Sequence, residues 1–290
     1  MMRDTRSSGT WLVILAALLW STGGAAIKYV DADGAVVAAA RCLIAGLVFL
    51  PFIRPGRVRF SWKLLALMLC YPLMSASFVI ATKWTTAMNA VAIQYTAPLW
   101  IFLALAAAGT IRPTARRAAP MVLAAFGIIL FLLEPAAGTS LKGNLVAIVS
   151  GVGFALVIVL FRALRDEHSL TLVSLSNLAT ALVLFPYILH TGQAAQLRGL
   201  DGGGWLCLLY LGAFQIGLAY VLYSRGLRTI TALKASTISL IEPVLNPVWA
   251  FIIMSELPSG YGVAGAVAIL GGVTADAYLN PGGKQVEREE

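Results

Sequence analysis

The chain has 290 residues, of which 59% are hydrophobic and only 12% charged, and its mean hydropathy is +0.85. Soluble domains carry about 25% charged residues, so this composition excludes a soluble catalytic domain and indicates a membrane protein embedded in the lipid bilayer. The net charge of +8 does not indicate nucleic-acid binding, because the basic residues form short clusters between apolar runs, as cytoplasmic loop charges do.

Ten apolar segments of membrane-spanning length follow one another along the chain. None alternates with a period of two residues, and lipid offers no partner to backbone groups, so the sequence predicts helices and not a β-barrel. The predicted fold class is therefore an all-α membrane protein with ten transmembrane helices. The predicted spans are Trp11–Ile27, Ala35–Ile53, Leu64–Thr82, Met88–Gly109, Ala118–Leu133, Leu145–Phe161, Ser169–His190, Trp205–Ser224, Ala235–Ser255 and Gly260–Ala275.

The basic residues between these spans predict the orientation of the chain. Four lie on one side, namely Lys28, Lys83, Lys142 and Arg198, and Arg41 lies within the second span. The other 16 lie on the side of the N-terminus: Arg3, Arg6, Arg54, Arg57, Arg59, Lys63, Arg112, Arg116, Arg117, Arg162, Arg165, Arg225, Arg228, Lys234, Lys284 and Arg288. Cytoplasmic loops carry an excess of Lys and Arg, so both termini are predicted to be cytoplasmic.

The two halves of the sequence resemble each other. A shift of 145 positions places Lys83 on Arg228, Thr86-Ala87 on Thr231-Ala232, Ala90 on Ala235, Pro98 on Pro243, Pro113 on Pro258 and Gly127 on Gly272. A shift of 135 positions places Leu47-Val48 and Pro51 on Leu182-Val183 and Pro186. Since each copy holds an odd number of spans, the second must enter the membrane from the opposite side. We therefore predict two inverted five-helix repeats, residues 1–142 and 143–290, the second with a short cytoplasmic tail.

The pattern resembles the drug/metabolite transporter superfamily, and within it the EamA-type branch. The resemblance rests on the duplication, on Arg41 in the second span, and on the stretches Thr231-Ala232-Leu233-Lys234-Ala235, Glu242-Pro243, Ser255-Glu256-Leu257-Pro258 and Gly271-Gly272. The first copy departs from the pattern, with Ile111-Arg112 where the second has Glu256-Leu257. The overall look is similar to bacterial aromatic amino-acid exporters, and the resemblance implies a multi-pass protein of the bacterial inner membrane that exports amino acids or related metabolites.

The fourth and ninth spans are the candidates for the substrate site, because each has a central proline that removes a backbone donor. Inverted-repeat carriers bind substrate near the midplane, at interrupted helices. The side chains around the two prolines are Gln94, Tyr95, Pro98 and Trp100 in one copy, and Ser239, Glu242, Asn246 and Trp249 in the other. The alternative is that the prolines kink two packed helices, whose polar groups bond to neighbours.

Two charged residues lie inside apolar spans, where charges are expensive and usually mark a pathway or a proton relay. Glu242 either binds a proton during transport or pairs with Arg41 or Lys234 and ties helices together. Arg41 either anchors a contact between helices or binds a substrate carboxylate.

Three tryptophans, Trp20, Trp100 and Trp249, lie too deep for the aromatic belt at the membrane surface. They either pack in the core or form the walls of a site for a flat apolar ligand. An aromatic or other hydrophobic amino acid is therefore a plausible small-molecule substrate.

Small residues recur at every fourth position of the last span, at Gly260, Ala264, Ala268 and Gly272, and at Ala115, Ala119 and Gly127 of the fifth. Such stripes permit close helix contact. Contact between the two halves of one monomer is the first interpretation, and a homodimer is the alternative.

No pattern indicates an enzyme, a metal site or a cofactor. The histidines, His168 and His190, have no metal-ligand spacing, and neither a Gly-x-Ser-x-Gly turn nor a phosphate-binding loop occurs. The function predicted is a secondary transporter that works by alternating access. The alternatives are a carrier for another class, such as nucleotide-sugars or drugs, and a structural membrane protein.

Overall fold

The computed structural model describes residues 2–53, 60–134, 138–164, 167–226, 229–230, 235 and 238–280. Within these residues the chain is helical and contains no strand. The sequence-based assignments at Arg54, Arg57, Arg59, Arg165, Arg228, Thr231, Ala232, Leu233, Lys234, Lys284 and Arg288 lie outside this part of the chain.

The first half of the sequence forms five membrane-spanning units. They consist of α1 (Met2–Ser21) with α2 (Gly23–Tyr29), α3 (Gly34–Phe49) with the short η1 (Leu50–Phe52), α4 (Trp62–Trp84), α5 (Ala87–Gln94) with α6 (Ala97–Ala107), and α7 (Ala115–Leu132). The first and fourth units are each divided into two helical segments.

The second half forms α8 (Leu141–Ala163), α9 (Ser169–His190), a connection with η3 (Gln193–Ala195) and α10 (Gln196–Gly199), and then α11 (Gly202–Tyr210), the π-helix η4 (Leu211–Leu218) and α12 (Ala219–Gly226) as one unit. The chain ends with α14 (Ile241–Met254) and α15 (Gly260–Leu279).

The helices match the predicted spans closely. In the described part of the chain, nine helical units are long and apolar enough to cross a membrane, and Ile241–Met254 is a shorter apolar helix at the ninth predicted span. Four of the seven tryptophans, Trp11, Trp62, Trp84 and Trp205, lie near the ends of the apolar spans with exposed side chains, as belt residues do.

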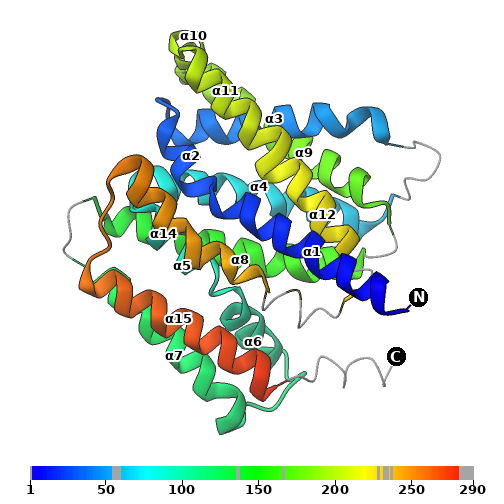
Figure 1. Cartoon of the computed structure of the whole chain (residues 1–290), viewed down its shortest axis with the longest axis vertical. Coiled ribbons are helices and arrows are strands. Elements are labelled where there is room, and N and C mark those ends of the chain that lie inside the picture. The colour runs from blue at the N-terminus through cyan, green and yellow to red at the C-terminus, as the bar shows by residue number, and fades with distance from the viewer. Residues whose placement is uncertain are drawn as a thin grey trace.

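Helices from the two halves pack against each other throughout the bundle. α3 packs on α9, α4 on α8, α1 on α12, α5 on α14, and α7 on α15. α7 and α15 lie side by side along one edge of the molecule, and α1 begins and α15 ends toward the right of the view (Figure 1). The most extensive helix contacts therefore lie between the halves, although α3 also packs on α4 within the first half.

The pair α7 and α15 confirms the contact that the small residues predict, but only part of the predicted face, namely Gly127, Ala268 and Gly272, lies in it. A Cβ on Gly127 would lie 2.6 Å from the carbonyl oxygen of Gly265, and one on Gly272 would lie 2.5 Å from that of Pro120. The contact thus follows Pro120, Ala124 and Gly127 on one helix and Gly265, Ala268 and Gly272 on the other. Gly260, Ala264, Ala115, Ala119 and Leu123 are exposed, because the helices are rotated relative to the stripe read from sequence.

Candidate functional site

Three helix interruptions meet in the middle of the bundle. α1 breaks at Thr22, the fourth unit breaks at Tyr95 and Thr96, and α14 begins after a turn at Leu240. Pro98 and Pro243 both lie in the first turn of the segment that follows, where the missing backbone donor has no intrahelical partner to lose. The two prolines therefore lie at the start of new helical segments and do not kink continuous helices, which was the alternative interpretation of the sequence.

Two adjacent glycines let the second half approach the break in α1. A Cβ on Gly23 would lie 2.4 Å from Nε2 of Gln215, and one on Gly24 would lie 2.6 Å from Nδ2 of Asn246. A larger residue at Gly23 would displace the end of the Gln215 side chain, whereas one at Gly24 would also meet Cβ of Ala87 at 2.8 Å.

A cavity of about 50 Å³ lies between the two halves, next to these breaks. Its walls are the aromatic side chains of Trp20, Tyr71, Phe78, Phe154 and Tyr220, the apolar Met74 and Ile216, the polar Ser75, Gln94 and Gln215, and the charged Arg41 and Glu242. Ligand-binding pockets usually measure about 300–1,000 Å³, so in this conformation the cavity has room for water only. A substrate would have to enter as the rings move apart.

Arg41 is a buried cation without a carboxylate partner in the described part of the chain. Its guanidinium donates to Oγ of Ser75 at 3.1 Å and, at the long distance of 3.5 Å, to Oε1 of Gln215. Its Nε has no hydrogen-bond partner, and its side chain is only 3% exposed. A buried charge left without compensation costs about 3–5 kcal/mol, so this guanidinium is ready to accept an anion.

Gln215 reaches Arg41 from the π-helix η4, and its Nε2 also donates to the carbonyl oxygen of Trp20 at 3.4 Å. π-helical turns are rare and often occur at functional sites. This turn joins the break in α1 to the charged wall of the cavity.

Glu242 lies in the first turn of α14, where the helix N-terminus favours a negative charge. Its Oε2 lies 2.8 Å from the hydroxyl of Tyr95, which also lies 2.9 Å from the carbonyl oxygen of Ser239. The described residues contain no ion pair between Glu242 and Arg41, and Lys234 lies outside them. Of the two salt bridges that the structural alternative for Glu242 allows, the one to Arg41 is therefore not formed in this conformation.

The nine predicted site residues fall into two groups. Trp20, Gln94 and Glu242 line the cavity. Tyr95, Pro98, Trp100, Ser239, Asn246 and Trp249 are not among its lining residues but lie at the helix interruptions beside it.

The second group of residues bonds to the chain around the interruptions. Trp100 donates to Oγ1 of Thr96 at 3.1 Å, whereas Trp249 donates to Oγ of Ser21 at 3.0 Å. Asn246 donates to the carbonyl oxygen of Ser21 at 3.1 Å. These side chains hold the interruptions in α1 and in the fourth unit together.

Arg41, Tyr71, Gln215 and Tyr220 line the cavity but are not among the nine residues, although Arg41 was weighed from sequence as a possible ligand of a substrate carboxylate. Arg41 could have been included on its charge alone, since an ionisable residue inside a span marks a functional site by default. The other three carry no signal that distinguishes them from core residues.

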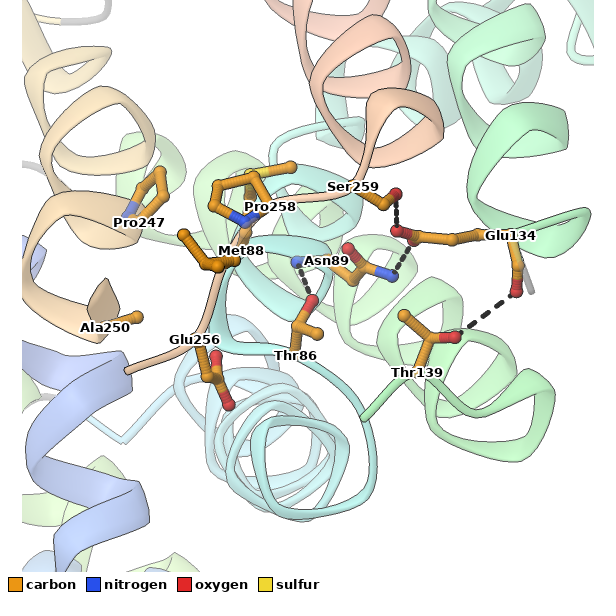
Figure 2. A pocket seen from close by; sticks show the side chains of 11 residues that line it. Thr86, Met88, Asn89, Glu134, Thr139, Pro247, Ala250, Glu256, Pro258 and Ser259 are labelled. Carbon is orange, nitrogen blue, oxygen red and sulfur yellow. Dashed lines mark hydrogen bonds between the residues drawn. The ribbon is translucent and has the colours of Figure 1, made fainter. Parts of the chain in front are cut away.

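A second group of charged residues closes one end of the bundle (Figure 2). Glu256, after α14, forms an ion pair with Lys28 at the end of α2 and accepts a hydrogen bond of 3.1 Å from the backbone N–H of Ala87. Glu134, after α7, accepts from Nδ2 of Asn89 at 2.7 Å and from the hydroxyl of Ser259. We call these six residues the closed end.

The free space at the closed end is only about 10 Å³, which is about the size of one water molecule. No group of three or more His, Cys, Asp or Glu in the described ranges is placed to hold a metal ion. The polar groups of the closed end therefore bond to one another and leave room for about one water molecule.

Comparisons with known proteins identify relatives of the whole chain. The model of the family described as EamA-like transporter family matches residues 7–133 and again residues 141–275. An uncharacterised transporter of Archaeoglobus fulgidus is 27% identical over 91% of this chain and 94% of its own length. The threonine/homoserine exporter RhtA of Salmonella typhimurium is 25% identical over 98% of both chains. One crystal structure matches with a TM-score of 0.65 at 21% identity, over 94% of this chain and 98% of that one, which shows a shared fold.

Proposed function

Because the chain belongs to the EamA-like transporter family, we propose that it is a secondary transporter that exports amino acids, aromatic or otherwise hydrophobic, or related small metabolites. Its apolar helices and its relatives identify it as a multi-pass inner-membrane protein. The single observation that carries the proposal is the cavity between broken helices, which presents Arg41 and Glu242 to the same small space.

The two halves, residues 1–142 and 143–290, are inverted repeats that move against each other in this proposal. The double match to one family model supports the duplication. Helices at corresponding positions pack in pairs, α3 on α9, α5 on α14 and α7 on α15, as two copies related by a twofold axis would. Together with the basic residues on the side of the N-terminus, this supports inverted halves with both termini in the cytoplasm.

We propose that the substrate site opens to one side of the membrane at a time, because polar contacts close one end of the bundle in this conformation. The closed end joins segments of both halves through the ion pair of Lys28 with Glu256 and the hydrogen bond from Ser259 to Glu134. With cytoplasmic termini, this end faces away from the cytoplasm. Substrate would then enter from the cytoplasm and leave when rocking of the halves separates these contacts.

The residues proposed to bind substrate are the nine predicted ones, in two roles. Trp20, Gln94 and Glu242 contact the substrate, since they line the cavity. Tyr95, Pro98, Trp100, Ser239, Asn246 and Trp249 shape the interruptions from which the first group projects.

The aromatic walls favour a hydrophobic side chain on the substrate. Trp20 stacks edge-on against Tyr220, with ring centroids 5.1 Å apart, and the rings offer faces against which an aromatic or aliphatic side chain can pack. The second candidate is a small hydroxylated amino acid, favoured by the threonine/homoserine exporters among the relatives.

Proton coupling through Glu242 is the energy source we propose. The hydroxyl of Tyr95 has a single proton, but two acceptors lie within reach, Glu242 and the carbonyl oxygen of Ser239. An ionised Glu242 accepts that proton in a hydrogen bond. A protonated Glu242 instead donates to Tyr95, which turns to donate to Ser239. Both charge states therefore have partners, as a residue that binds and releases a proton requires.

The test is efflux from proteoliposomes that contain the purified full-length chain. Vesicles are loaded in turn with radiolabelled phenylalanine, tyrosine, leucine, threonine, homoserine and a nucleotide-sugar. Saturable efflux of amino acids and not of the nucleotide-sugar is expected. If no amino acid leaves faster than from vesicles without protein, the proposed function is wrong.

A further inference from the structure

Within the proposed function, we infer that the central cavity is a zwitterion site, in which Arg41 binds the carboxylate of an α-amino acid and Glu242 holds its ammonium group. The inference rests on the proposed transport of amino acids and adds which groups of the substrate are recognised. It rests on four observations, which are the free donors of Arg41, its lack of a counter-ion, the position of Glu242, and the apolar remainder of the walls.

Arg41 has donors left for a ligand. A guanidinium has five N–H donors in a planar fork that matches a carboxylate. Ser75 takes one at 3.1 Å, and Gln215 accepts only a long bond at 3.5 Å. Nε is buried and has no partner at all. A carboxylate that entered the cavity would replace these weak, neutral contacts with charged ones.

The surroundings of Arg41 do not neutralise it. The ring centroid of Phe78 lies 6.0 Å from the guanidinium carbon, at the limit of a cation–π contact. The one ion pair in the described part of the chain, Lys28 with Glu256, belongs to the closed end. A purely structural arginine at this depth would be expected to have a carboxylate partner.

Glu242 provides the opposite charge on the same cavity, and it comes from the other half of the sequence. One of its oxygens, Oε2, is engaged by Tyr95, whereas no described residue bonds to Oε1. Arg41 on α3 and Glu242 on α14 therefore present a cation and an anion to the same small cavity. A substrate with an ammonium group next to a carboxylate satisfies both.

The lining of the cavity disfavours other classes of substrate. An anion without an amino group would be attracted by Arg41 but repelled by the carboxylate of Glu242. An amine without a carboxylate would be attracted by Glu242 but repelled by Arg41. The remaining walls are aromatic, aliphatic or neutral polar, with Trp20, Phe154 and Tyr220 among the rings, so a second charged group on the substrate would find no counter-charge there. The geometry thus favours a neutral α-amino acid.

The test compares an amino acid with analogues that lack one charge, using the full-length protein in proteoliposomes. L-Phenylalanine and L-threonine are the labelled probes. The competitors are the parent amino acids, the amino alcohols phenylalaninol and threoninol, which lack the carboxylate, and the N-acetyl amino acids, which lack the ammonium. Both classes of analogue are expected to compete at least tenfold more weakly than the parent.

Variants of Arg41 then test whether this residue binds the carboxylate of the substrate. Arg41→Gln should raise the half-saturation concentration of the amino acid at least tenfold and remove the difference between amino acid and amino alcohol. Arg41→Lys should keep part of that difference, because it keeps the charge. The matched control is Arg198→Gln, which removes an exposed arginine on α10 and should leave the difference intact.

The outcomes separate this inference from the proposed function. If amino acids are transported but the amino alcohols compete equally well, the zwitterion site is wrong and the transporter stands. The same holds if Arg41→Gln retains the discrimination. If the wild-type protein transports no amino acid, both fail. The wild-type competition needs no substitution, so misfolding of a variant does not prevent a decision.

Discussion

The cavity and the closed end contain the same kinds of groups, buried between helices, but differ in how completely these groups satisfy each other. At the closed end Glu256 pairs with Lys28, and Glu134 accepts two hydrogen bonds. In the cavity Arg41 has only neutral partners, and Glu242 is bonded by a tyrosine. The free space is about 10 Å³ at the closed end and about 50 Å³ in the cavity.

This difference assigns each region a role. A charge that finds its counter-ion in the protein stabilises the conformation in which the two meet. A charge that does not find one stabilises whatever ligand supplies it. The charges of the closed end are neutralised without a substrate, so the closed end holds the two halves together. The charges of the cavity are not, so the cavity binds a substrate. The four predictions below test that contrast.

Locking the closed end should have the largest effect. In a background in which Cys42, Cys70 and Cys207 are replaced by Ala, Lys28→Cys and Glu256→Cys would be joined by a short bis-maleimide. Because the two side chains meet across the end that must open, efflux should stop completely. Each single-cysteine variant treated in the same way is the control. Efflux that continues after cross-linking, as verified by mass spectrometry, would rule out opening at this end.

Filling the glycine contact beside the cavity should come next. Gly24→Val would place a Cβ 2.6 Å from Nδ2 of Asn246 and 2.8 Å from Cβ of Ala87. Overpacking of this kind costs about 1–3 kcal/mol, and by pushing α14 away it should reduce efflux at least tenfold. Thermal unfolding and efflux would be measured on the same preparation. Gly202→Val, where no atom lies within 4 Å, should change neither.

Removing the carboxylate of the cavity should change the pH dependence and not only the rate. If Glu242 must bind a proton in each cycle, wild-type efflux falls as pH rises, because the protonated fraction falls. Glu242→Gln should make efflux independent of pH. The titratable groups around the same cavity, namely Arg41 on α3, Tyr71 on α4, Tyr95 at the break after α5 and Tyr220 on α12, remain in this variant.

The matched control for that prediction is Glu134→Gln, which removes a carboxylate of the closed end and should retain the pH dependence. An unchanged pH profile in Glu242→Gln, measured in proteoliposomes, would show that this glutamate does not carry the proton.

Weakening the ion pair of the closed end without a cross-link should have the smallest effect. The side chains of Lys28 and Glu256 are 15% and 21% exposed, so both are partly buried, and the cost of desolvating the two charges offsets much of their attraction. Lys28→Met and Glu256→Gln should each change the efflux rate about twofold, and the double variant should change it no further. Fully additive effects in this double-mutant cycle would indicate that the pair does not hold the end closed.

The fold could be predicted from the sequence to a large extent because membrane insertion depends on local properties. In the described ranges, all of the predicted spans except Ala235–Ser255 appear as helices of spanning length, and that span appears as the shorter α14. Apolar length is a property of one segment, so no tertiary information is needed. The packing of α7 on α15 was also predictable. The full set of residues in the contact was not, since a stripe of small residues does not tell how far each helix is rotated about its own axis.

The candidate site could be predicted only in part, for a related reason. Depth within a span can be read from position, but the direction in which a side chain points depends on the neighbouring helices. Trp20, Trp100 and Trp249 lie at similar depths in their spans, yet only Trp20 lines the cavity, whereas the other two bond to Thr96 and Ser21. Arg41 and Gln215 meet from positions 174 residues apart, which no local pattern predicts.

The sequence by itself determined that this protein lies in a membrane as a bundle of helices and that its halves are related, because hydrophobicity and repetition are encoded segment by segment. It also restricted the charges inside the spans to a few residues. Only the tertiary structure decided which of these charges are neutralised. Lys28 meets Glu256, while Arg41 and Glu242 face one cavity without meeting, because electrostatic compensation depends on distances of a few ångströms between helices from the two halves.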